Sequence, residues 1–455
     1  MSRETEGGRA GTGGELPPKE PGGTPRRWPR RRLLRWALGL VPAAAVGGWA
    51  TFEWLEREEA RAWAEQWTLE AARRCFARHP DTRRWLDDAL GNLKSYGPAR
   101  LMYACWRMEQ GDWNLARAFL SSPPLKDTPE ARLLLELAER RPRMPDWRHA
   151  FFEAWKALGR PDFRKSTLLP VPLEPDHLLL YMHVDWEQSD EPKRFPLAVL
   201  GLKEFEERLD WGLEQVRAST SVPLLMALRE QLLPQDTQLP QRQLLLPAVE
   251  ERLGQLTGPT PQTLQLALRS FLTNSSPEAP LERRDLEALE KLVPLEWKQP
   301  ASERFYLEMR ERFEGLLLLP HHHAWVLATL AQGKSLGLEL LRRARASKAH
   351  LNEDEQRWMG RLLWEVGARL REQRSRLELE TGLRLQVFGS ELTGHSDTRM
   401  DSLSLWVELG QWEQALARSA FNRWPLASLQ EESCAPRARD EHAWLRAFAD
   451  KGELP

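Results

Sequence analysis

Residues 98–120 read PARLMYACWRMEQGDWNLARAFL and give the clearest indication of the fold in the chain. Small and unbranched apolar residues lie on both sides of Gln110-Gly111-Asp112. Such residues lose little rotamer freedom in a helix, whereas Gly adopts backbone angles that other residues resist. The stretch therefore predicts two helices joined by a tight turn at Gly111, with Ala104 and Ala116 allowing the two helices to approach closely.

This turn resembles that of the tetratricopeptide family, whose repeat is a helix pair of about 34 residues. In that family the turn reads Gly-Asp-aromatic and is followed by Ala and then by a large apolar residue, as in Gly111, Asp112, Trp113, Ala116 and Leu120.

A second stretch, residues 402–421 (SLSLWVELGQWEQALARSAF), places Gly410, Trp412 and Ala415 in similar positions. Here Ser419 replaces the large apolar residue, and neither stretch has the closing proline of the family. The resemblance implies an all-α, TPR-like array of helical hairpins that binds other proteins.

Composition and periodicity extend the helical prediction along the chain. Leu, Ala, Arg and Glu dominate and β-branched residues are scarce, which favours helices. Asn352 with Glu355 three residues later resembles a capping box. The further predicted helices are residues 53–79, 82–94, 129–140, 146–158, 200–218, 223–233, 244–256, 263–271, 281–292, 301–319, 324–341 with a possible break at Gly333, and 353–380.

Two stretches depart from this pattern. Residues 166–196 carry five prolines around the apolar run 178–186, which fits either a short strand or a buried helix. Residues 383–388 (LRLQVF) are a second strand candidate. A minor β patch near residues 176–188 is therefore an alternative within the all-α prediction.

The sequence divides into five predicted segments. They are a disordered cytoplasmic tail (1–31), a transmembrane anchor (32–55), an N-terminal helical domain (56–164), a proline-punctuated helical middle region (165–300) and a C-terminal helical domain (301–455). The tail is rich in Gly, Pro, Glu and Thr, so it cannot bury enough apolar surface to fold.

The anchor prediction rests on residues 33–55, which would span roughly 34 Å as a helix. Trp36 lies at one edge and Trp49 and Trp54 near the other, as in the aromatic belts of membrane helices. Within this segment, residues 36–52 carry no charge; six arginines between residues 26 and 35 precede this uncharged run, and four glutamates between residues 53 and 59 follow it. This asymmetry predicts a single-pass protein with a cytoplasmic N-terminus and an exported body, which in a bacterium lies in the periplasm.

Two alternatives remain for this segment. Residues 30–35 (RRRLLR) resemble a twin-arginine export signal, with cleavage after residues 43–45 or after Ala50, which would leave a soluble exported body. An amphipathic surface helix or a buried core helix is the other reading. Apolar residues from Ala60 to Cys75 recur at helical spacing with no breaker before them, so the anchor helix is expected to continue into the body.

Charge and cysteine content exclude some classes of function. The residues after position 35 hold 56 Lys and Arg against 62 Asp and Glu, so the body has no basic surplus for a nucleic acid backbone. Cys75, Cys105 and Cys434 form no C-x-x-C motif. We expect small apolar fillers, with a pair between Cys75 and Cys105 as the alternative.

Histidine and acidic clusters offer weak metal candidates. Residues 321–323 (HHH) point about 100° apart on a helix and cannot converge on one ion, so an exposed helix start is expected. His395, Asp397 and Asp401 could hold a cation, although Ser396 or Asp397 as a helix cap is the simpler interpretation.

Residues 333–337 (GKSLG) have no phosphate-loop glycine, because Ala328 stands in its place. Ser335 fits a nucleophile motif only if a strand precedes it, and its flanks are helical in pattern. We therefore assign no catalytic residue, metal or cofactor.

Three functions are compatible with these features. The leading one is a membrane-anchored helical-repeat scaffold that binds a protein partner on the exported side and contacts lipid through its N-terminal helix. An exported enzyme with a scattered carboxylate site is the second. A structural subunit of a membrane complex, packed through Gly39, Ala43 and Gly47, is the third.

Overall fold

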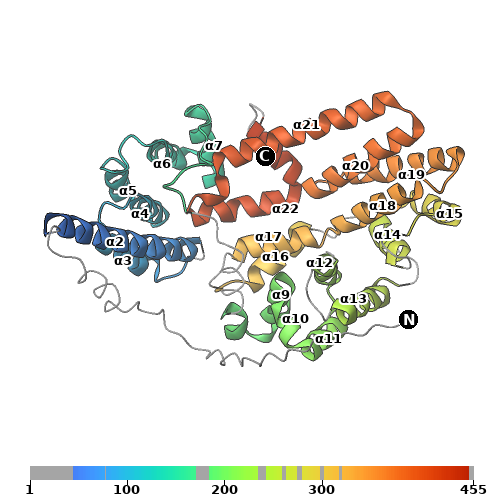
Figure 1. The fold of residues 1–455 in the computed structure, drawn as a ribbon, viewed down its shortest axis with the longest axis horizontal. Coiled ribbons are helices and arrows are strands. Elements are labelled where there is room, and N and C mark those ends of the chain that lie inside the picture. The colour runs from blue at the N-terminus through green and yellow to red at the C-terminus, as the bar shows by residue number, and fades with distance from the viewer. Residues whose placement is uncertain are drawn as a thin grey trace, which may run out of the picture. The chain divides into compact units, whose positions relative to one another are not determined.

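A computed structural model of the chain describes residues 45–76, 78–170, 184–233, 242–258, 263–273, 279–297, 302–316 and 320–449. Helices are the only regular secondary structure in these residues (Figure 1), which confirms the all-α prediction for them. The chain divides into two units, Met1–Glu59 and Ala60–Pro455, and helix α2 (Ala45–Phe76) crosses that boundary. The remaining helices belong to the second unit.

The predicted membrane anchor lies only partly within the described residues. Trp36 is outside them, while Trp49 and Trp54 lie on α2. Of the helices in the described residues, none is both long and apolar enough to cross a membrane. Residues 45–76 form one unbroken helix, as the lack of a breaker after the anchor predicts.

Local sequence signals set the boundaries of the next helices. The side chains of Asp112, Thr128 and Asp146 each accept a hydrogen bond from a backbone N–H in the first turn of the helix that follows. The helices are α3 (Thr82–Asn92), α4 (Gly97–Glu109), α5 (Trp113–Leu120), α6 (Pro129–Arg140), the short 3₁₀ helix η1 (Arg141–Arg143) and α7 (Trp147–Ala157).

The middle of the chain is more broken than predicted, and the single helix expected over residues 200–218 is wrong. The chain turns at Leu202, which has a left-handed φ of 59°. This turn lets Phe205 bury against Gly212, where an added Cβ would lie 2.5 Å from the Phe205 ring. The helices are α9 (Glu191–Gly201), α10 (Lys203–Glu207), α11 (Leu209–Ala218), α12 (Val222–Leu232), α13 (Arg242–Thr257), α14 (Leu264–Thr273) and α15 (Arg283–Leu292).

Both strand candidates are corrected where they are described. Residues 184–188 are helical, and the rest of the run at 178–186 lies outside the described residues. Residues 383–388 lie inside a helix, α20 (Arg376–Thr393), in which Leu383 and Leu385 are fully buried. Packing on several sides buries most positions of this helix, including polar Gln386, so the alternation of apolar residues did not indicate a strand.

The C-terminal third confirms one predicted break and adds another. Gly333 has φ 68° and separates α17 from α18, as expected. The single helix predicted over residues 353–380 is wrong, because it ends at Arg371 and Ser375 caps a new helix. Asn352 and Glu355 form the predicted capping box. Besides α20, the helices are α16 (Ser302–Arg312), α17 (Pro320–Leu330), α18 (Lys334–Ser347), α19 (Glu353–Arg371), α21 (Ser396–Ser419), the 3₁₀ helix η2 (Phe421–Arg423) and α22 (Ala427–Ala449).

The C-terminal helix α22 joins segments that are distant in sequence. It packs against α7, α16, α17 and α21. One hydrophobic core combines residues of α4–α7 with residues between 379 and 448, and here Phe151 meets Phe421 with ring centroids 5.1 Å apart. A second, larger core extends over residues between 186 and 438 and also includes α22.

Helices α19 and α20 lie side by side (Figure 1) and make the most extensive helix–helix contact within the described residues. Glycines seven residues apart line both sides of it: Gly360 and Gly367 on α19, and Gly382 and Gly389 on α20. A Cβ added at Gly367 would lie 2.6 Å from the carbonyl oxygen of Gly382, so the two backbones nearly touch. Because α20 also packs against α21, this contact helps to position α21.

Candidate functional site

The hairpin predicted from residues 98–120 is confirmed. Gly111 joins α4 to α5 with φ 77°, a conformation that favours glycine. Ala116 is fully buried, and the Trp113 ring stacks on Trp147 with centroids 5.6 Å apart. These residues hold helices together and do not form an open site.

The second predicted turn is wrong. Gly410, Trp412 and Ala415 all lie within α21, a continuous helix from Ser396 to Ser419. Trp412 is buried and Ala415 is half-buried. One internal glycine costs a helix only about 1 kcal/mol, which packing of a long helix readily offsets.

Helix α21 has two different faces. Leu409 and Trp412 belong to the buried inner face. Met400, Leu403 and Val407 are 64%, 37% and 60% exposed and follow one another at spacings of three and four residues. They therefore form one apolar stripe on the outer face, over about 10 Å at 1.5 Å per residue. We call these three residues the α21 stripe.

A row of carboxylates borders the α21 stripe. Asp401 and Glu408 each follow a stripe residue by one position, about 100° further round the helix. Asp397 precedes Asp401 by four residues and lies on the same side. All three are exposed, and none forms an ion pair within the described residues, although Asp397 accepts a hydrogen bond from the Ser396 hydroxyl at 3.2 Å. We call these three residues the acidic row.

The α21 stripe was not predicted from the sequence. Its signal is the spacing of Met400, Leu403 and Val407, which is visible only when the segment is treated as one helix. The predicted turn at Gly410 divided residues 402–421 into two helices, so this spacing was not recognised.

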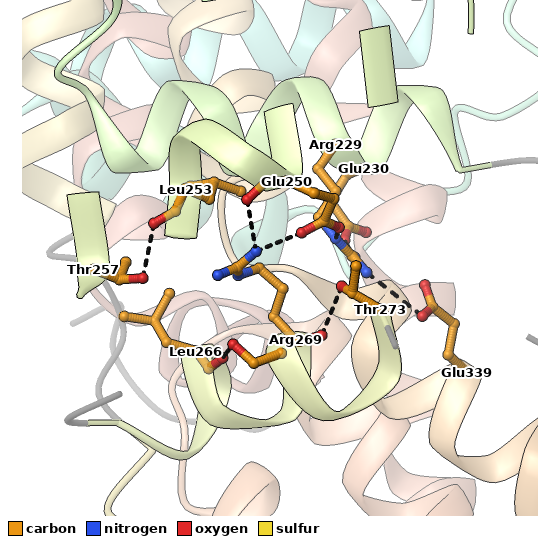
Figure 2. Close-up of polar contacts among 10 residues, drawn as sticks. Arg229, Glu230, Glu250, Leu253, Thr257, Leu266, Arg269, Thr273 and Glu339 are labelled. Carbon is orange, nitrogen blue, oxygen red and sulfur yellow. Dashed lines mark hydrogen bonds and ion pairs between the residues drawn. The ribbon is translucent and has the colours of Figure 1, made fainter. Parts of the chain in front are cut away.

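A cluster of buried charges lies elsewhere, among α12, α13, α14 and α18. Figure 2 shows Glu250 between Arg229 and Arg269. Arg229 Nε lies 2.7 Å from Glu250 Oε1, and its Nη2 lies 3.5 Å from Glu339. Arg229 also pairs with Glu230 at 3.4 Å.

The cluster is enclosed, because Arg229 is 2% exposed and the other four charged side chains are also largely buried. Burial opposes the charge on Arg229, but the surrounding carboxylates outweigh it and raise its pKa. The arrangement ties four helices together and offers no access to a substrate.

A second polar chain connects five segments near the C-terminal helix. The Tyr306 hydroxyl lies 3.1 Å from His321 Nδ1, and His321 Nε2 lies 3.3 Å from Glu431. Arg78 donates to Glu431 at 2.6 Å and to Ser428 at 2.9 Å. Burial opposes ionisation of Glu431, but the hydrogen bonds from His321 and Arg78 outweigh it and lower its pKa to about 2.

Glu109 lies at the other end of this chain. It accepts hydrogen bonds from the Ser428 backbone at 3.0 Å and from the Ser428 hydroxyl at 2.6 Å. Burial nevertheless raises its pKa, since its side chain is only 5% exposed. The neighbouring carboxylates Glu109 and Glu431 thus have opposite pKa shifts, but both already accept hydrogen bonds from other side chains of the protein.

A pocket of about 330 Å³ lies between α21, α22 and the start of α20. Its charged lining groups are engaged within the protein: Arg376 pairs with Glu413 and Arg437 with Glu441. Arg423 donates to five backbone carbonyls between residues 163 and 170. The pocket therefore presents no free charged group that could select a ligand.

The histidines at 321–323 match the expected exposed helix start only in part, because only His322 is exposed. They begin α17, but His323 is 5% exposed and His321 is held by Tyr306 and Glu431. No group of three or more potential metal ligands occurs in the described part of the chain.

The other candidate residues also have structural surroundings. His395, not Ser396 or Asp397, stands at the N-cap of α21, and its side chain makes no capping bond, so the predicted cap is wrong. Ser335 lies in α18 after the helical turn at Gly333, without a preceding strand. The three cysteines are free and buried, and burial raises the pKa of each thiol.

Comparisons with protein-family models, with curated proteins and with solved structures gave no match to this chain. The site must therefore be interpreted from its own geometry.

Proposed function

We propose that this chain is a membrane-tethered helical protein that binds another protein through the outer face of α21. The observation that carries the proposal is the α21 stripe, whose three large apolar side chains share one exposed face. The other large apolar residues that are exposed in the described residues, Trp63, Leu244, Leu307 and Trp364, lie singly on four different helices. Single exposed apolar residues are ordinary, whereas an aligned set favours binding of a partner helix.

The tether and the export of the body are part of the proposal. They rest on the apolar segment at residues 33–55, whose uncharged part (36–52) has arginines before it and glutamates after it. A tethered protein binds a partner at the membrane at a raised effective concentration, so its role would be recruitment. The TPR-like arrangement stays a proposal too, supported by the hairpin at Gly111.

The enzyme alternative receives less support. It requires carboxylates that can reach a substrate, but Glu109 is buried and bonded by Ser428, and Glu431 is bonded by Arg78 and His321. The subunit alternative rests on Gly39, Ala43 and Gly47. Gly39 and Ala43 lie outside the described residues.

In-cell photo-crosslinking tests the binding proposal. A photoreactive amino acid is placed at Val407 in the full-length protein and, as a control, at exposed Glu365 on α19. We expect one dominant protein to be captured at position 407 and not at 365, and Val407→Ser to reduce its co-purification about tenfold. The same captured set at both positions, or none at 407, would refute the proposal.

Thiol labelling tests the orientation. Ser404 is exposed on α21, and the three native cysteines are buried, so Ser404→Cys adds a single accessible thiol among the described residues. A membrane-impermeant maleimide should label this variant in intact spheroplasts if the body is exported. Labelling only after the membrane is permeabilised would show the opposite orientation.

A further inference from the structure

The charges beside the α21 stripe indicate what kind of helix binds there. We infer that the outer face of α21 takes an amphipathic helix with basic residues along one edge of its apolar face. This inference rests on the proposed function and specifies the partner of the same site. Its basis is the acidic row, Asp397, Asp401 and Glu408, which runs parallel to the α21 stripe.

The geometry of the row matches that of a docked helix. Asp397 and Glu408 are eleven residues apart, which is about three turns, so the row stays on one side of α21 over roughly 16 Å. A helix lying along Met400, Leu403 and Val407 would have one edge beside the row throughout this length. Lys or Arg on that edge would meet three carboxylates that lack a cation among the described residues.

The same charges disfavour a second copy of the chain in an antiparallel arrangement. In such a symmetric pair each flank of a helix faces the same flank of its copy, so the acidic row would face another acidic row. Like charges placed opposite one another act against that pairing. Arg399, the cation of α21 nearest the stripe, lies on the other side of the stripe from the row.

Two synthetic peptides test the inference with the full-length protein in phosphatidylcholine nanodiscs. Both are 21-residue helices with the same leucine stripe, and one has lysines and the other glutamates along its edges. Binding is followed by fluorescence anisotropy, and empty nanodiscs correct for lipid binding. We expect about tenfold tighter binding of the lysine peptide at 50 mM salt, since three exposed charge pairs each contribute modestly. The preference should shrink at 500 mM salt, because salt screens exposed charges.

Variants separate the contribution of charge from that of the stripe. The double variant Asp401→Lys/Glu408→Lys should bind the glutamate peptide more tightly than the lysine peptide. Val407→Ser should weaken the binding of both peptides. The control, Glu365→Lys/Glu372→Lys, makes the same change in net charge on and just after α19 and should leave the preference unchanged.

Equal binding of both peptides, tighter binding of the glutamate peptide, or binding of neither would overturn the inference. If crosslinking at Val407 persists in any of these cases, only the partner's chemistry is wrong and the proposed function stands. If sedimentation shows a dimer that Val407→Ser dissociates, the face belongs to a second copy, and this also overturns the inference.

Discussion

Because α19 and α20 pack so closely, we expect the small substitution Gly367→Ala to lower the free energy of unfolding substantially. The added Cβ would lie 2.6 Å from the carbonyl oxygen of Gly382 and 2.8 Å from Cγ of Gln386. The carbonyl belongs to the backbone of α20 and cannot rotate away. The helices must therefore separate by about 1 Å, which removes roughly a quarter to a half of the attraction of the neighbouring contacts.

The expected magnitude follows from two opposing effects. Replacing Gly by Ala inside a helix favours folding by about 1 kcal/mol through helix propensity. Overpacking a close contact typically costs about 1–3 kcal/mol and sometimes more. Because the atom met here is backbone, we expect the upper part of that range and a net loss of about 2 kcal/mol in the free energy of unfolding.

Gly410→Ala is the matched control, since Gly410 also lies inside a helix and an added Cβ there meets no atom within 4 Å. It should stabilise the protein by up to about 1 kcal/mol. Urea titrations of the full-length protein, followed by far-UV circular dichroism, measure both variants. If Gly367→Ala is as stable as Gly410→Ala, the two helices separate without cost and the reasoning is refuted.

Substitutions at three further positions test other parts of the structure by the same titration. Arg229→Met should lower stability by about 3–5 kcal/mol, because it removes the cation from buried Glu339 and leaves Glu250 with Arg269 alone, and a loss below about 1 kcal/mol would contradict the role of the cluster. Glu431→Gln should destabilise the protein on the order of 2 kcal/mol at pH 7. A depressed pKa contributes stability above the unfolded value near 4.5, so the difference should vanish as pH falls from about 4.5 to about 2, and a difference independent of pH would refute the ion pairing. Gly111→Ala should cost about 1 kcal/mol, since φ is 77° and no atom lies near the added Cβ, and Gly111→Asn should cost less; equal stability of all three proteins would show that the turn relaxes.

The sequence predicts a helix well where a local signal marks its ends. Pro at the first position and Thr128 as cap mark α6, whose predicted bounds agree with the observed ones. Gly333 marks the break between α17 and α18. The unpredicted breaks lack Gly and Pro, because Leu202 is an unusual residue for a left-handed turn and residues 372–375 contain neither. The second break does carry a capping signal, Ser375 with Glu378 three residues later, which the prediction missed. Packing of Phe205 and of α20 sets these breaks.

The α21 stripe could be predicted only in part, because its recognition depends on the correct helix boundaries. The spacing of Met400, Leu403 and Val407 is present in the sequence, but it has meaning only within one continuous helix. Gly410 has the residue type of a turn and yet lies in that helix. The charge cluster around Arg229 was beyond local analysis, since its partners come from helices separated by up to about a hundred residues.

The packing of α22 explains why the outer face of α21 stands apart. In an open solenoid each repeat touches only its neighbours, and the terminal repeats need polar capping faces. Here α22 packs on α7, and Ser428 donates to Glu109 of α4, so helices of the N-terminal part cover the C-terminal helix. The α21 stripe is therefore not the uncapped surface of a terminal repeat. It is an apolar stripe on a helix whose inner face is already satisfied by α20 and α22, which leaves a partner as the simplest reason for its exposure.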